Sequence, residues 1–289
     1  MDTQKYRALL EAIDCGSITE AAIRMGYTQS ALSRMVAELE RQWDVILLHR
    51  GKSGVQPTAD ARSLISHIRA LVAAEDNLNV QISAVKGLEA GSLRIATFSS
   101  VATHWLPSIV NQLQHDHPGI VCELLLGDYD EIESWVEEGR ADCGFLGRRP
   151  YGNLDAWQAG QDQFMAVLPS NHFLGHAPAF PVEAFADEPF LLLTTGVEEV
   201  VARINAHTEK PIAPALSTFD DYAIMAMVES GMGLAILPSL ILRRIDYNLC
   251  ILPLSTPEFR EITLVTKKGP QSAAMSEFLS YLEAFLAQA

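Results

Sequence analysis

Side chains that hydrogen-bond well to the edges of DNA bases are concentrated at the start of a predicted helix over residues 28–43. Glutamine can bond adenine at two points, serine can donate or accept, and arginine can pair with guanine or with a phosphate. The residues that would carry this chemistry are Thr28, Gln29, Ser30, Ser33 and Arg34. A solvated helix face can have the same composition, so the flanking segments must decide between the two interpretations.

A basic turn follows this helix. Val45–Leu48 and Val55-Gln56 have the pattern of two short strands around a glycine-containing tip, His49–Gly54, that carries Arg50 and Lys52. Cations in such a hairpin would lie against the phosphate backbone while the neighbouring helix contacts the bases. The hairpin favours DNA binding over a solvated helix face.

Three helices are predicted to position these side chains. The first has one apolar stripe at helical spacing, formed by Tyr6, Leu9, Leu10 and Ile13. Ser17 and Glu20 form a capping box at the start of a short second helix, which ends at Gly26. The third helix has a buried stripe formed by Leu32, Met35, Val36, Leu39 and Trp43. A short helix, a tight turn and a helix with a polar N-terminal face are typical of a helix-turn-helix.

A long helix is predicted to begin after Thr58, which can cap it. Along it, seven residues alternate spacings of four and three: Leu64, Ile68, Leu71, Glu75, Leu78, Ile82 and Val85. This is a heptad pattern with one charged interruption, and it predicts pairing with a second helix of the same kind.

These segments together resemble the winged helix-turn-helix of LysR-type transcriptional regulators across residues 1–62. The matching motifs are Ser17–Ala22, Gln29–Arg34, Leu39-Glu40, Leu47–Arg50 and Thr58. The family often has glycine where Asp44 stands, and alanine-glycine where Asp60-Ala61 stand. The resemblance implies a DNA-binding domain over residues 1–57 and a linker and dimerisation helix over residues 58–89.

From residue 93 the pattern alternates strand and helix, which predicts an α/β fold with a parallel sheet covered by helices. This part is similar to the effector domain of the same family, whose fold resembles the two-lobed periplasmic binding proteins. The spacing of Gly139–Asp142 and Gly231–Pro238 follows that family. The resemblance implies an effector domain over residues 90–289, with lobe I at about 90–163 and 267–289 and lobe II at about 164–266.

Parallel sheets bind ligands beyond the carboxyl ends of their strands. The residues expected there are Ser99, Ser100, Asp128, Arg148, Thr195 and Gly196. A helix begins after Gly196, and its free N–H groups favour an anion. Arg148 resembles the arginine that some aromatic-acid-responsive members place at this strand end. We therefore expect a small carboxylate-bearing effector held by Arg148 and by nearby hydroxyl groups.

Composition limits the class of protein. The 289 residues have a net charge of −15, all of it beyond residue 87, because the first 87 residues have equal numbers of acidic and basic side chains. The DNA-binding part therefore lacks the acidity that would repel a polyanion. Four scattered cysteines, the absence of a long apolar run and a charged N-terminus predict a cytoplasmic protein away from membranes.

Two alternative classes are a solute-binding protein of a transporter and an enzyme built on the α/β domain. The first predicts a signal sequence and no helix-turn-helix, and the sequence contradicts both. The second needs a nucleophile, acid–base or metal set, and none is found: Gly231-x-Gly233 lacks the rest of a dinucleotide fingerprint, and His115-x-His117 lacks further ligands. We expect no catalytic residue, cofactor or metal, and a homodimer or homotetramer on promoter DNA.

Overall fold

The computed structural model describes residues 3–51, 54–85 and 91–288, so that Lys52 lies outside the described residues. The chain divides close to residue 90 into two compact units, and each has its own apolar core. Within the described ranges, none of the helices combines the length and the apolar character that crossing a lipid bilayer requires.

The first unit begins with three helices, α1 (Thr3–Asp14), α2 (Ile18–Arg24) and α3 (Gln29–Trp43). Their caps are as predicted. The hydroxyl of Ser17 accepts the N–H of Glu20 at 3.3 Å, and that of Thr28 accepts the N–H of Ala31 at 3.2 Å. Gly16 follows α1 with φ of 61°, a left-handed conformation that glycine adopts without strain. The predicted helix starts are confirmed.

Asp44 ends α3 in the left-handed region, with φ of 55° and ψ of 39°. This is the position at which the LysR-type pattern often has glycine. Aspartate is one of the few other residues that visit this conformation, because its short polar side chain can bond locally. The departure from the family pattern is therefore compatible with the same turn.

The wing hairpin consists of β1 (Leu48–Gly51) and β2 (Gly54–Pro57), paired antiparallel. We expected its first strand at residues 45–48, and that expectation is wrong by three residues. The backbone N–H groups of Leu47 and Leu48 donate to the carboxylate of Glu40 on α3, at 2.8 and 3.1 Å. Because the Glu40 side chain accepts these two N–H groups, the pairing of β1 with β2 begins only at Leu48. Arg50 therefore lies within a strand.

The long helix is α4 (Ala59–Val85), and its first turns pack against the other helices of the first unit. Ile68, which the heptad pattern assigned to the pairing stripe, is 3% exposed in this core. Glu75, the charged interruption, accepts hydrogen bonds from Thr3 at 2.6 Å and Arg7 at 3.0 Å on α1. The stripe that stays exposed consists of Leu71, Leu78 and Ile82.

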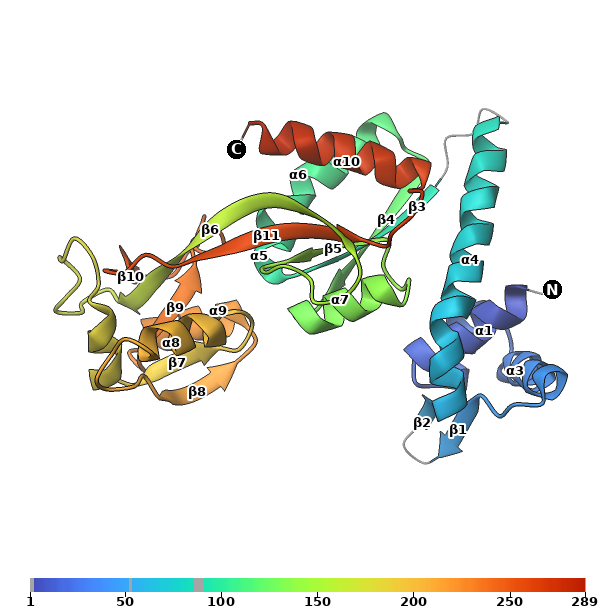
Figure 1. Cartoon of the computed structure of the whole chain (residues 1–289), viewed down its shortest axis with the longest axis horizontal. Coiled ribbons are helices and arrows are strands. Elements are labelled where there is room, and N and C mark those ends of the chain that lie inside the picture. The colour runs from blue at the N-terminus through green and yellow to red at the C-terminus, as the bar shows by residue number, and fades with distance from the viewer. Residues whose placement is uncertain (1–2, 52–53, 86–90, 289) are drawn as a thin grey trace. The chain divides into compact units, whose positions relative to one another are not determined.

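The second unit has two lobes. Lobe I contains three parallel strands in the order β4-β3-β5, namely β3 (Gly91–Thr97), β4 (Ile120–Leu126) and β5 (Cys143–Leu146). Its helices are α5 (Ser99–His104), α6 (Leu106–Asp116), α7 (Tyr129–Glu137) and the C-terminal α10 (Ala273–Leu286). The predicted strands over 120–126 and 143–146 are confirmed, and α10 packs against α6 (Figure 1).

Two long antiparallel strands, β6 (Asp155–Pro169) and β11 (Phe259–Thr266), run side by side between the lobes (Figure 1). The first half of β6 pairs with β11, and its second half pairs with strands of lobe II. The sequence pattern located only the second half of β6, from Phe164. Ile262, Leu264 and Val265 pack in the core of lobe I, whereas we expected lobe II to extend to about residue 266.

Lobe II contains the strands β7 (Phe190–Leu193), β8 (Pro214–Thr218), β9 (Leu234–Pro238) and β10 (Leu249–Pro253). Its helices are η1 (Val182–Asp187), α8 (Val197–Asn205) and α9 (Asp221–Glu229). The strand β7 pairs parallel with both β8 and β9, so the carboxyl ends of these three strands lie at one edge of lobe II. The segments Ser99-Ser100, Asp128 and Thr194–Gly196 follow such strand ends.

Candidate nucleic-acid interface and ligand cavity

The polar face predicted on α3 is open to solvent. Its buried side chains are Leu32, Val36 and Leu39, which pack in the core of the first unit. The residues expected to contact DNA include four that are exposed, Thr28, Gln29, Ser30 and Arg34, and one that is half-buried, Ser33. Neither Gln29 nor Arg34 donates a side-chain hydrogen bond to another described residue. Both therefore retain the donors that base edges or phosphates accept.

Arg50 on β1 is held beside this face. Its guanidinium donates to the hydroxyl of Ser33 on α3 at 2.8 Å and lies 3.8 Å from Glu40. Arg50 remains 43% exposed, so its other donors can reach a phosphate. The hairpin and α3 thus present one continuous polar surface.

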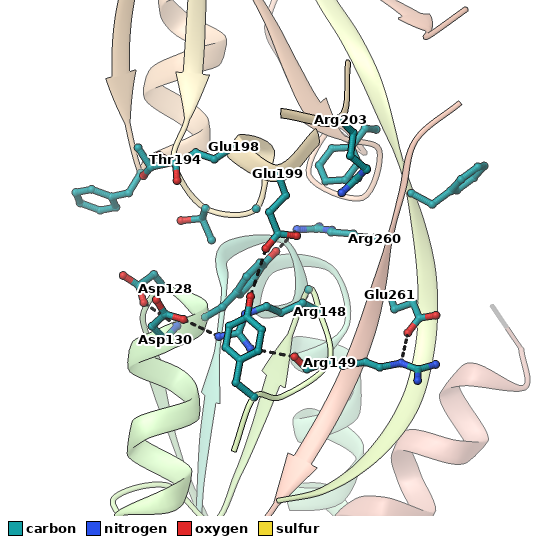
Figure 2. A pocket seen from close by; sticks show the side chains of 18 residues that line it. Asp128, Asp130, Arg148, Arg149, Thr194, Glu198, Glu199, Arg203, Arg260 and Glu261 are labelled. Carbon is teal, nitrogen blue, oxygen red and sulfur yellow. Dashed lines mark hydrogen bonds and ion pairs between the residues drawn. The ribbon is translucent and has the colours of Figure 1, made fainter. Parts of the chain in front are cut away.

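The second unit contains two adjoining cavities between its lobes. The first encloses about 540 Å³ and is called here the Arg148 cavity, after the arginine labelled in Figure 2. Its walls also include Thr195 and Gly196. The second encloses about 760 Å³ and is called here the Asp221 cavity; its walls include Ser99, Ser100 and Asp221. The two share Asp128, Thr194, Thr195, Phe219 and Arg260. All six residues expected to contact an effector therefore line these cavities.

Arg148 is already engaged by carboxylates of the chain. Its guanidinium lies 2.6 Å from Glu133, 2.6 Å from Asp130 and 3.8 Å from the ring centre of Tyr151. Figure 2 shows this side chain directed toward Asp130. Glu133 is 8% exposed and holds Arg148 from inside, whereas Asp130 is 86% exposed. A carboxylate ligand at Arg148 would have to displace Asp130.

Arg260 is the polar centre of both cavities, and the sequence-based analysis missed it. Its buried guanidinium bonds the carboxylate of Asp162 at 2.7 and 3.0 Å, and it donates to the hydroxyl groups of Ser100 at 2.7 Å and Tyr129 at 3.0 Å. Its carbon lies 4.7 Å from the ring centre of Phe98. The available signal was the alternation along β11, where Arg260 shares a face with the apolar Ile262 and Leu264.

Tyr129 brings the lobes into contact. A Cβ on Gly147, at the end of β5, would lie 2.0 Å from the Tyr129 hydroxyl, and a Cβ on Gly196 would lie 2.9 Å from its ring. Gly196 also has φ of 81°, which favours glycine independently. Burial raises the pKa of Tyr129, although Arg260 opposes the rise. The predicted residue Gly196 thus serves close packing against this ring.

The N-terminal end of α9 carries a buried carboxyl group, that of Asp221. Asp221 is 8% exposed, and burial raises its pKa, while a hydrogen bond from Ser99 and the charge of Arg260 oppose the rise. The predicted residue Ser99 therefore contacts a carboxylate of the chain, as Ser100 contacts an arginine. Among the described residues, no group of three or more histidine, cysteine, aspartate or glutamate side chains is arranged to hold a metal ion.

Comparisons with known families cover nearly the whole chain. The family model described as "Bacterial regulatory helix-turn-helix protein, lysR family" matches residues 3–62, and that described as "LysR substrate binding domain" matches residues 86–287. The probable HTH-type transcriptional regulator LrrA of Synechococcus elongatus is 29% identical over 244 residues, 83% of this chain and 82% of that protein. The HTH-type transcriptional activator CmpR of Synechocystis sp. is 25% identical over 281 residues, 92% of this chain and 90% of that protein.

Solved structures share the fold. A variant of full-length OxyR from Pseudomonas aeruginosa superposes with a TM-score of 0.74 at 18% identity, covering 99% of this chain and 94% of that one. CbnR, a LysR family transcriptional regulator, gives 0.70 at 16% identity, covering 99% of both chains. Full-length CbnR complexed with its target DNA gives 0.68 at 18% identity, covering 99% of this chain and all of that one.

Proposed function

The chain belongs to the LysR family of bacterial DNA-binding transcriptional regulators. From this premise we propose which parts of the chain contact DNA and which bind the effector. The N-terminal face of α3 reads base edges in the major groove, and the wing contacts phosphates. The observation that carries this proposal is the exposed face of α3, on which the side chains of Gln29 and Arg34 donate no hydrogen bond within the described residues. Beside this face, Arg50 is hydrogen-bonded to Ser33. Lys52, which follows Gly51 in the sequence and lies outside the described residues, is proposed as a further phosphate contact.

DNA binding can be tested without knowing the regulated genes. Genomic fragments that the full chain retains are selected, sequenced and bound again in a retardation assay. We expect an imperfect palindrome with half-sites about one helical turn, ~34 Å, apart, because two copies would present two recognition helices. The same assay without residues 1–87 should show no retardation. Equal retention of all fragments at moderate salt would contradict sequence-specific reading.

We propose that the effector of this regulator occupies the cavities between the lobes. Their volumes, about 540 and 760 Å³, suit a small molecule. A ligand there touches residues of both lobes and of the crossing strands, so it can favour one lobe arrangement over another. It can shift that balance only as far as its affinity differs between the two arrangements.

Two effector chemistries deserve comparison at this site. A carboxylate held by Arg148, Ser99, Ser100 and Thr195 is the chemistry expected from the sequence. It would need to replace Asp130 at Arg148, and it would approach a helix start, that of α8, which already carries Glu198 and Glu199. A cationic group meets no such competition in the Asp221 cavity.

We further propose that two or four copies of the chain assemble through the exposed stripe of α4. Leu71 and Leu78 are 47% and 59% exposed, and apolar residues at this spacing pair with a second helix. The proposed role is regulatory rather than enzymatic, in keeping with the regulators among the relatives. We place this activity in the cytoplasm, where bacterial promoter DNA is found.

A further inference from the structure

Each arginine on the cavity walls is paired with a carboxylate of the chain: Arg148 with Glu133 and Asp130, Arg149 with Glu261, Arg203 with Glu258, and Arg260 with Asp162. A guanidinium whose charge is matched at contact distance attracts a second anion weakly. The cavities therefore offer little unmatched positive charge to a ligand.

Carboxylates exceed cations in the Asp221 cavity, and most of them have a local structural role. Asp128 accepts the N–H of Glu131 at 2.8 Å, and Glu131 accepts the N–H of Asp128 at 3.1 Å, so the two cap the start of α7 reciprocally. Asp220 caps α9 by accepting the N–H of Tyr222 at 2.9 Å. The fourth carboxylate on these walls, Asp221, stands in the first turn of α9 and is hydrogen-bonded by the Ser99 hydroxyl and by its own backbone N–H.

Asp221 is a buried carboxyl group without an ion-pair partner at contact distance. No ion pair joins it to any residue in the described ranges, and its hydrogen-bond donors are neutral, the Ser99 hydroxyl and its own backbone N–H. The positive charge of Arg260 interacts with Asp221 electrostatically. The hydrogen bonds of this guanidinium, however, go to Asp162, Ser100 and Tyr129. Burying an unpaired carboxylate is costly, which leaves this wall of the cavity suited to a cation from outside the chain.

Aromatic rings stand beside this carboxylate. Phe219 is 77% exposed and Tyr222 is 39% exposed, and both line the Asp221 cavity. They flank Asp220-Asp221 in the chain, so the rings and the carboxylates approach the cavity from the same segment. Ring faces attract ammonium groups, and carboxylate with aromatic side chains is the combination that recognises amines and methylated ammonium ions.

We infer that the effector of this regulator carries an ammonium group, bound between the carboxylate of Asp221 and the rings of Phe219 and Tyr222. The inference rests on the proposed function of the inter-lobe site and adds the chemical class of its ligand. The remaining volume of the Asp221 cavity, about 760 Å³ in all, takes the rest of a small organic molecule.

The test measures ligand-induced thermal stabilisation of the full chain. The probes are n-pentylamine and choline as cations, pentanoate and pentanol as matched anionic and neutral molecules, and magnesium chloride as an inorganic cation. A ligand that binds the folded state raises the melting temperature with its concentration. We expect stabilisation by at least one of the two organic cations, and none by pentanoate, pentanol or magnesium at the same millimolar concentration.

Variants tie the effect to the site. Asp221→Asn keeps the shape and removes the charge, and Phe219→Ala changes an exposed side chain whose loss leaves the core intact. Each should weaken amine binding roughly tenfold or more, the scale of a lost charge or cation–π contact. Asp187 lies outside both cavities and pairs with Lys210 at 2.7 Å. Asp187→Asn removes an equivalent charge there and should leave the binding of the organic cations unchanged.

The outcomes separate this inference from the proposed function. No stabilisation by either organic cation, or stabilisation by these cations that is unchanged in both site variants, overturns the inference. Stabilisation by pentanoate that is lost in Arg148→Ala also overturns it, yet upholds an effector site between the lobes. Magnesium stabilisation that depends on Asp221 replaces the organic cation by a metal ion. DNA retardation by the same protein tests the regulator function independently of every probe.

Discussion

The guanidinium of Arg50, on the wing strand β1, donates a hydrogen bond of 2.8 Å to the hydroxyl of Ser33, on helix α3. The two residues are 17 positions apart, and this bond joins the predicted phosphate contact to the predicted base-reading helix. An arginine held in this way loses less side-chain entropy when DNA binds. The orientation of the wing cation is thus linked to the position of the recognition helix.

Gln29→Ala should remove base reading and leave general affinity in place. We expect a loss of about 1–3 kcal/mol on the selected operator and little change on scrambled duplexes. Fluorescence anisotropy on both duplexes measures the difference. Gln42→Ala is the control, because Gln42 is an exposed glutamine at the other end of α3. An unchanged preference for the operator in Gln29→Ala would show that this side chain does not read bases.

Arg50→Ala should weaken binding to all duplexes alike. One lost phosphate contact lowers the slope of log affinity against log salt by about 0.9. Arg50→Lys keeps the charge but not the planar guanidinium, so it should retain the salt slope and part of the affinity. Salt titrations of operator and scrambled DNA test this. A loss confined to the operator would assign Arg50 to base reading instead.

Replacing both Leu71 and Leu78 by aspartate should yield monomers with weak DNA binding. Charges in an apolar pairing stripe must be desolvated when helices associate, which favours separation. Light scattering gives the mass of the assembly. Ala70→Asp adds the same charge at an exposed position about a quarter turn off the stripe and should leave the assembly intact. A native mass for the double variant would locate the main contact elsewhere.

Asp162→Ala should destabilise the second unit by about 3–5 kcal/mol, because it leaves the buried Arg260 without its carboxylate. Asp162 also accepts hydrogen bonds from Ser239 at 2.8 Å and the N–H of Leu240 at 3.0 Å, which would be lost as well. Denaturant unfolding measures the change. The exposed pair of Asp187 and Lys210 offers the comparison: Asp187→Ala should cost under about 1 kcal/mol. Similar costs for the two variants would refute a special role of the buried pair.

Asp221→Asn should raise the melting temperature of the ligand-free protein at neutral pH. Burial raises the folded-state pKa of Asp221 above its unfolded value, so its ionisation opposes folding at every pH above the folded pKa. The penalty vanishes below the unfolded pKa, about 3.9. The groups that face it are Ser99 from α5, Arg260 from β11, Tyr129 from α7 and Asp220 on its own helix.

Melting curves of Asp221→Asn and of the unchanged protein between neutral pH and about pH 4 measure this gain. It should shrink as the pH falls through the pKa of Asp221. Asp187→Asn, which alters an exposed carboxylate, should follow the unchanged protein at each pH. A neutral-pH melting temperature of Asp221→Asn equal to or below that of the unchanged protein would show that the buried charge carries no penalty.

Local patterns were sufficient for the helices of the DNA-binding part. The caps at Ser17 and Thr28 join groups three residues apart, and helical stripes repeat every three or four residues. Because both patterns are local, they can be recognised in the sequence. The strands β4 and β5 could be recognised equally well, because short apolar runs bounded by turns allow few other structures. Strand ends then predicted which residues would line the ligand site.

Contacts between distant segments set the chemistry of that site. Arg260 and Asp162 lie 98 positions apart, and Arg148 and Glu133 lie 15 apart on different elements. No pattern along the chain states that these charges meet, so Arg148 was expected to be free for a carboxylate and Arg260 was missed. The first half of β6 is polar and largely exposed where it pairs with β11 between the lobes, and Ile68 of the heptad pattern is buried in its own unit. The spacing of residues along the chain shows which side chains share a face of a helix or strand. The packing of distant segments decides which side chains that face contacts, and therefore which charged groups stay unpaired and available to a ligand.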